Sequence, residues 1–175
     1  ADSGVIYFGN DQDVTITHDP DDGLFLKSTA TADDNPFLLT LQTGETDLAA
    51  NDVIGKIAFQ APDEATGTDA ILVAAGIEAV SEGDFAADNN ATKLSFKTAA
   101  SEAAAEKMSL SSTGLLTVSG RILTNDTTEA TSTTDGSLQT DGGLSVAKSA
   151  VIGDDLDLLS DSAILSIGAG KDFTI

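Results

Sequence analysis

The 175-residue sequence contains no cysteine and no tryptophan, and only one tyrosine, one methionine and one histidine. Without cysteine the chain has no disulfide, no thiolate zinc site and no thiol nucleophile. No apolar run approaches the roughly 18 residues that a membrane-spanning segment requires, so we expect no membrane insertion. The start of the chain also lacks the basic and apolar regions of a secretory signal peptide.

Basic residues are scarce as well. Eight Lys and Arg stand against 29 Asp and Glu, which gives a formal net charge of −21. Nucleic acid is excluded as a partner because binding to phosphates requires a cationic surface, and anionic membrane surfaces are excluded for the same reason. The charge is typical of a soluble assembly in a saline medium, where ions screen the repulsion and lateral clumping is opposed. The alternative is a single, moderately acidic protein.

Large apolar side chains are thinly spread, although apolar residues make up 41% of the chain. Much of that fraction is alanine, and the larger residues occur in short runs separated by Gly, Asp and Thr. A monomer of this composition buries little area per residue, so conformational entropy nearly cancels the gain from burial. We therefore expect several chains to associate.

The two ends of the chain are similar to each other. Residues 1–16 and 160–175 align without a gap, and six positions are identical, including the pairs Gly9 with Gly168 and Ile16 with Ile175. Such self-similarity is typical of repeat arrays, whose units bury apolar faces against neighbours. The alternative is one strand–turn–strand motif used twice in a single domain. Because the chain opens with Ala1 and ends within an apparent strand, we expect an excerpt of a longer polypeptide.

Short β-type runs bounded by turn residues predict an all-β fold. We expect strands at 5–8, 14–18, 24–26, 37–41, 53–59, 70–80 (with a break at Gly76 as an alternative), 93–97 and 107–110. The Ala- and Glu-rich segment 99–110 is too short for a long helix, and we expect a hairpin or a single helical turn there. Eleven bulky residues up to about position 112 predict a compact core: Phe25, Phe37, Leu39, Ile57, Phe59, Ile71, Val73, Phe85, Leu94, Phe96 and Met108.

The pattern changes after Thr113. Short apolar runs alternate with Gly- and Thr-rich turns, and Thr124–Ser137 has no bulky apolar residue. That stretch is either a flexible linker or a crossing segment held by partners, and this half cannot build a closed core from one chain. We predict four regions: a shaft-type β repeat (1–34), a compact β domain (35–118), a Thr/Gly-rich shaft segment (119–159) and the start of the next repeat (160–175).

Few residues suggest chemistry. His18 stands alone, so one chain cannot assemble a cluster of His and Cys ligands, but threefold symmetry would bring three copies to one axis around an ion. Asp19, Asp21 and Asp22 supply oxygen ligands of the kind that Ca²⁺ prefers, although the twelfth position of an EF-hand loop would be Ala30 rather than Glu. Backbone requirements of tight turns also explain these residues. No nucleotide-binding or catalytic motif occurs, so we expect neither an enzyme nor a cofactor.

Two blocks of the sequence are similar to a known family. Asn51–Val118, and especially its closing part SEAAAEKMSLSSTGLLTV, resembles elements of tail-fibre and related structural proteins of marine and cyanobacterial bacteriophages. Thr127–Leu158 resembles the Thr/Ser-rich run and glycine motif that punctuate such fibres, but Gln139 and Asp141 replace residues that are usually apolar. The resemblance implies an intertwined parallel homotrimer with a prism-like or β-helix-like shaft and small β-sandwich-like swellings.

The leading hypothesis is therefore a structural protein, a repeating segment of an extracellular or virion fibre that acts as a spacer or adhesion shaft. Its partners would be copies of itself, end-to-end neighbours, and a cell-surface receptor or glycan. The alternative is a subunit of a secreted bacterial surface filament or adhesin. A glycan-binding or glycan-cleaving module is a third class, indicated only by the β architecture.

Overall fold

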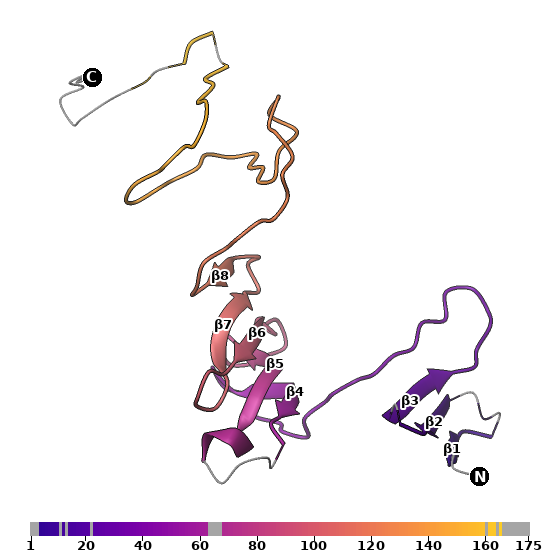
Figure 1. The fold of residues 1–175 in the computed structure, drawn as a ribbon. Coiled ribbons are helices and arrows are strands. Elements are labelled where there is room, and N and C mark those ends of the chain that lie inside the picture. The colour runs from indigo at the N-terminus through magenta and orange to yellow at the C-terminus, as the bar shows by residue number, and fades with distance from the viewer. Residues whose placement is uncertain are drawn as a thin grey trace. The chain divides into compact units, whose positions relative to one another are not determined.

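The structure is a computed structural model that describes residues 4–10, 12, 14–21, 23–62, 68–159, 161–163 and 165. These residues form eight strands and one 3₁₀-helix, arranged as two antiparallel sheets, and no α-helix occurs among them (Figure 1). The predicted all-β class is confirmed. The chain divides into two units, residues 1–122 and 123–175, which are described separately below. The trimeric shaft stays a prediction, because the structure contains a single chain.

The N-terminal sheet has three strands in the order β1 (Val5–Phe8), β2 (Val14–Asp19) and β3 (Gly23–Ser28). Their β-branched and aromatic residues favour strands, and Gly-, Asp- and Asn-containing turns separate them. In the β2–β3 turn, Asp21 and Gly23 adopt positive φ angles of 70° and 121°. Three of the predicted strands are confirmed here.

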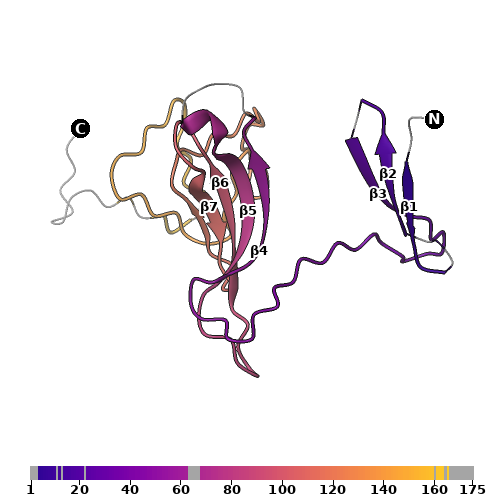
Figure 2. The same cartoon turned by 90° about the horizontal axis from the view of Figure 1, so that it is seen from below.

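The second sheet is an antiparallel meander of five strands in sequence order. It comprises β4 (Val53–Gln60), β5 (Val73–Ser81), β6 (Thr92–Thr98), β7 (Ala105–Leu110) and β8 (Leu116–Val118). A 3₁₀-helix, η1 (Asp69–Ile71), precedes β5. Strands β4 to β7 lie side by side and bend along their length (Figure 2). All five strands fall between residues 35 and 118, in one sheet, and the sandwich-like swelling stays a prediction.

Two sequence-based expectations for local structure need correction. The predicted strand at 37–41 is wrong, because these residues have irregular backbone and are paired with no strand of the described chain. The predicted strand at 70–80 starts only at Val73, after η1, and is not broken at Gly76, which pairs with both Ala58 and Lys97. A hairpin is confirmed for segment 99–110, since β7 pairs antiparallel with β6.

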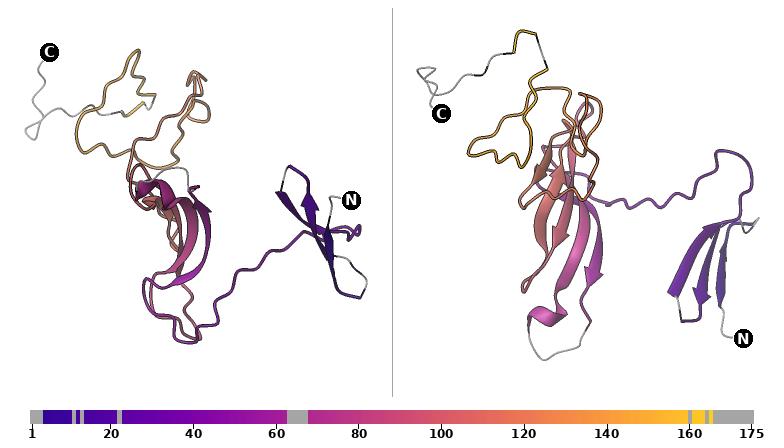
Figure 3. Two further views of the ribbon diagram at one scale, coloured as in Figure 1. Left: turned by 60° about the horizontal axis from the view of Figure 1, so that its bottom comes forward. Right: turned by 45° about the horizontal axis from the view of Figure 1, so that its top comes forward.

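The C-terminal unit contains no strand among its described residues. The apolar runs at 122–123, 144–146, 151–152 and 156–159 all have irregular backbone (Figure 3). Local turns are held instead by side chains of Asp126 and Asp135, which accept hydrogen bonds from Thr128, Thr131 and Ser132. The Thr-rich stretch is thus internally hydrogen-bonded, a property that its polar composition alone did not indicate.

The predicted compact core is wrong. Val80, at 8% exposure, is the single buried hydrophobic residue in the described part of the chain, and none of the eleven predicted core residues is buried. The physical reason is that each sheet is amphipathic but nothing in the described chain covers most of its apolar side.

Candidate interaction face

The register of the second sheet places its large apolar residues on one side. Ile57, Ile77, Phe96, Met108 and Val118 lie opposite one another in a row that crosses all five strands. A parallel row consists of Gly55, Ala79, Leu94, Leu110 and Leu116, and a shorter one of Phe59, Ala75 and Thr98. Directly opposed residues of antiparallel strands share a face, so these three rows form one continuous surface, here called the open face.

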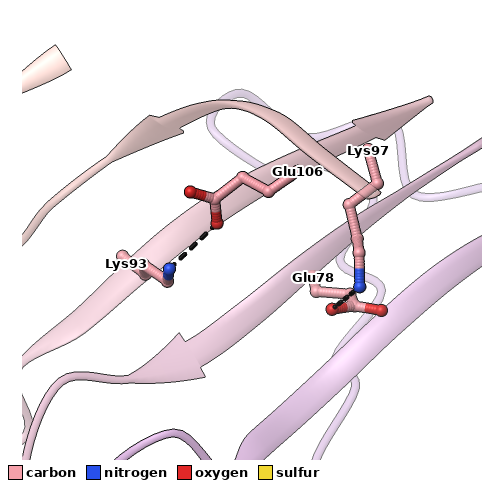
Figure 4. Close-up of polar contacts among 4 residues, drawn as sticks. All are labelled: Glu78, Lys93, Lys97 and Glu106. Carbon is pink, nitrogen blue, oxygen red and sulfur yellow. Dashed lines mark hydrogen bonds and ion pairs between the residues drawn. The ribbon is translucent and has the colours of Figure 1, made fainter. Parts of the chain in front are cut away.

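The other side of the sheet, here called the polar face, holds the charges. Lys97 Nζ lies 2.9 Å from the Glu78 carboxylate, and Lys93 Nζ lies 2.9 Å from the Glu106 carboxylate (Figure 4). Ser95 and Ser109 are directly opposed between these ion pairs. No Asp, Glu, Lys or Arg occurs in the three rows of the open face.

Burial on the two faces is the reverse of what a monomer favours. Ser95 is 2% exposed, whereas its sequence neighbour Leu94 is 42% exposed on the open face. Ser95 lies between Lys93 and Lys97 on β6 and opposite Ser109, so the long side chains of the two ion pairs border it. Covering a serine while leaving leucines in water forgoes stabilisation of about 25 cal/mol for each Å² of apolar area.

The N-terminal sheet shows the same reversal. Ile6, Ile16 and Leu26 are directly opposed on one face, and Ile6 is 60% exposed. On the opposite face Thr15, which pairs with Tyr7 and Lys27, is only 7% exposed. Residues 36–39 line an apolar groove of this sheet together with Phe8, Val14, Ile16, Leu26 and Ser28. The failed strand prediction at 37–41 thus marks a segment that contacts an apolar face without pairing.

One end of the five-stranded sheet is fixed by a hydrogen-bonded loop centred on Ser81, which is 1% exposed. The Ser81 hydroxyl donates to the Ala49 carbonyl and accepts from the Asp52 amide, and the Ser81 amide donates to the Asp52 carbonyl. The Asn51 amide in turn donates to the Ser81 carbonyl. These bonds hold residues 49–52 against β5 and so position β4, which follows directly.

The segment before β4 also reaches the open face at Gly55. A Cβ atom at Gly55 would lie 3.2 Å from the Leu41 Cβ and 3.5 Å from the Leu41 carbonyl oxygen. Leu41 lines a shallow depression of about 150 Å³ with Gly55, Ile57, Ile77, Ala79 and Leu94 among others. Leu41 therefore fills the space above Gly55, and the short side chain of Ala79 leaves the neighbouring part of the open face hollow.

Several carboxylates are held in their charged form. The pKa of Glu106 is kept below its ordinary value of 4.5, mainly by the hydrogen bond from the Lys93 ammonium and to a smaller extent by Ser95 and Ser109. Hydrogen bonds from Ser112 lower the pKa of Glu82, whose carboxylate accepts from the Ser112 amide at 2.9 Å. In the C-terminal unit, hydrogen bonds from Thr128 lower the pKa of Asp126, and those from Thr131 and Ser132 lower that of Asp135.

The residues proposed as ion ligands lie near one turn. His18 is exposed on β2 opposite Leu24, Asp19 ends that strand, and Asp21 is exposed in the β2–β3 turn. Asp22 lies outside the described residues. Across the part of the chain that the structure describes, no three His, Asp or Glu side chains are close enough together to hold a metal ion. The calcium and axial-ion assignments stay predictions.

Sequence reasoning located strands β1 to β7 but missed the open face. Ala79, Leu110, Leu116 and Val118 were not singled out, although the alternation in β6 (Thr-Lys-Leu-Ser-Phe-Lys-Thr) already separates an apolar from a charged side. This alternation within a strand indicates which of its residues are on the apolar side. Only the register shows that the apolar sides of five strands join into one surface.

Comparisons with protein families, with curated proteins and with solved structures found no match to this chain. In the described part of the chain, no helix has the length and apolar character needed to cross a membrane.

Proposed function

We propose that this chain is a structural protein, a repeating segment of an elongated extracellular or virion fibre in which three parallel copies share an interior. The observation that carries this proposal is the reversal of burial, with Leu94 open and Ser95 covered. A chain selected to act alone would bury the leucine. A chain that acts in an assembly needs its apolar faces uncovered until copies meet.

The first copy of the terminal repeat supports a repeating unit. Residues 5–8 and 14–19 form the β1–β2 hairpin, with a register that runs from Val5 opposite Thr17 to Phe8 opposite Val14. Such a hairpin has too little core for independent stability, which favours stacking on neighbours. Most of the second copy, residues 160, 164 and 166–175, lies outside the described residues.

The net charge agrees with this role. A net charge of −21 per chain opposes lateral aggregation of assembled fibres. The three rows of the open face carry no charged residue. The resemblance to bacteriophage tail fibres gives the same class of function. A subunit of a bacterial surface filament would share these physical features and would differ in the genes that accompany it.

Sedimentation equilibrium of the 175-residue chain tests the proposal. We expect a species of three times the 17.7 kDa chain mass, which dissociates in denaturant together with its loss of β-structure. A stable, folded monomer at all concentrations would contradict the proposal. In a second measurement at about 1 M salt we expect stronger association, because salt screens the mutual repulsion of the acidic chains.

A further inference from the structure

The open face has an unequal distribution of side-chain size. Along the row through Gly55, Ala79, Leu94, Leu110 and Leu116, small residues on β4 and β5 give way to leucines on β6 to β8. Gly55 and Ala79 line the 150 Å³ depression together with Leu41, which packs over Gly55, and Leu116 on the edge strand is 56% exposed. The same surface therefore carries both a hollow and the side chains of a size to fill it.

We infer that the open face is the interface between copies of this chain, with the exposed Leu116 of one copy seated in the depression beside Ala79 of the next. The inference rests on the proposed fibre function and assigns its contact surface. The polar face, with its two ion pairs, then faces solvent.

Charge supports a second copy as the occupant. An acidic partner of −21 is repelled by any surface that carries carboxylates, and the rows of the open face carry none. A cationic partner would instead be attracted most strongly to the acidic surfaces outside the open face. The open face is therefore the part of this protein on which another copy meets the least repulsion.

Area supports the same occupant. Ile57, Phe59, Leu94, Leu110 and Leu116 each leave about half of their side chain exposed, and with the half-buried members of the rows this amounts to on the order of 600 Å² per copy. In the proposed trimer each copy divides its open face between two neighbours, so the three faces together bury roughly 1,800 Å², which is within the range of roughly 1,200–2,000 Å² found for stable, specific interfaces.

Two adjacent residues of β8 provide a matched pair of variants. Leu116 lies on the open face and Thr117 on the polar face, and both are exposed on the edge strand. We expect Leu116→Asp to weaken self-association at least a hundredfold, because a carboxylate would be desolvated in the interface. Thr117→Asp introduces the same charge at the same edge and should leave association within about threefold of the unchanged protein.

Disulfide trapping tests the contact directly, since the chain has no cysteine of its own. Residues 79 and 116 are three strand spacings apart in one sheet, roughly 14 Å, which exceeds the reach of a disulfide. Any bond in the Ala79→Cys/Leu116→Cys double variant therefore joins two chains. We expect covalent oligomers on a non-reducing gel, and none from the Ala79→Cys/Thr117→Cys control.

The outcomes separate this inference from the proposed function. An associating chain whose Leu116→Asp and Thr117→Asp variants behave alike, with no trapped oligomer, overturns the assignment of the open face and leaves the fibre proposal standing. A chain that stays monomeric at all concentrations overturns both. Should Leu116→Asp fail to fold, the cysteine pairs still decide the question, because they introduce no charge.

Discussion

The five-stranded sheet and the segment 123–159 both contain apolar runs, yet only the sheet forms strands. Strands β4 to β7 have six to nine residues each, and in β6 apolar and polar positions alternate. The apolar runs of the C-terminal segment have two to four residues and are separated by Gly, Asp and Thr. A longer run provides enough cross-strand hydrogen bonds and paired side chains to offset the entropy of ordering the backbone.

The comparison shows two ways in which one chain holds its shape. In the sheet, order comes from contacts between residues far apart in sequence, such as Glu78 with Lys97. In the C-terminal segment it comes from hydrogen bonds over two to four residues, such as those of Thr131 and Ser132 to Asp135. Changes in the first region should therefore affect global stability, and changes in the second should stay local.

Replacing one glycine in each region by alanine should give the largest difference in stability between the two regions. A Cβ at Gly76, which pairs with Ala58 in the sheet, would lie 3.0 Å from the Ile57 carbonyl oxygen, whereas nothing lies within 4 Å at Gly153. We expect Gly76→Ala to lower the free energy of unfolding by about 1–3 kcal/mol, because backbone must move to accommodate the methyl group. Gly153→Ala should change it by less than about 0.5 kcal/mol. Urea denaturation followed by circular dichroism measures both, and equal losses would refute the contrast.

Removing one charge of the polar face should have a smaller, pH-dependent effect. Since the pKa of Glu106 is lowered in the folded chain, its ion pair stabilises fully above pH 4.5 and is lost as the pH falls through the lowered value. We expect Glu106→Gln to cost about 0.2–1 kcal/mol at pH 7, because the pair is partly exposed. The difference from the unchanged protein should shrink below pH 4.5 and at high salt.

Glu102→Gln, in the exposed turn between β6 and β7, is the matched control for the loss of one negative charge. Urea titrations at several pH values would show whether the acid-dependent difference is specific to Glu106. A constant difference between the Glu106 variant and the unchanged protein down to pH 2 would argue against the ion pair as its cause.

The smallest effect on stability should come from Asp135→Ala. The Asp135 carboxylate accepts from the Thr131 and Ser132 amides, both at 2.8 Å, so its removal should shift the NMR signals of these two amides. The denaturation midpoint of the sheet should not change. Asp141→Ala, in the same unit, should leave both amide signals in place, and a lowered midpoint in the Asp135 variant would mean that the two regions are coupled.

Much of the fold could be predicted from local pattern. Strands such as Val5–Phe8 were located from β-branched residues between turn signals, which act over a few neighbouring positions. The irregular backbone at 37–41 could not be predicted this way, because an apolar run becomes a strand only where a second strand supplies hydrogen-bond partners. The same limit applies to the short runs after residue 122.

The sequence by itself determined the all-β class, the acidic surface and the shortage of large apolar side chains, since composition and alternation depend on no distant contact. Only the tertiary structure decided which residues share a face. The register of five strands joins Ile57 to Val118 in one row and brings Lys93 Nζ within 2.9 Å of the Glu106 carboxylate. The physical reason is that a shift of one residue in strand pairing would move every side chain of that strand to the opposite face.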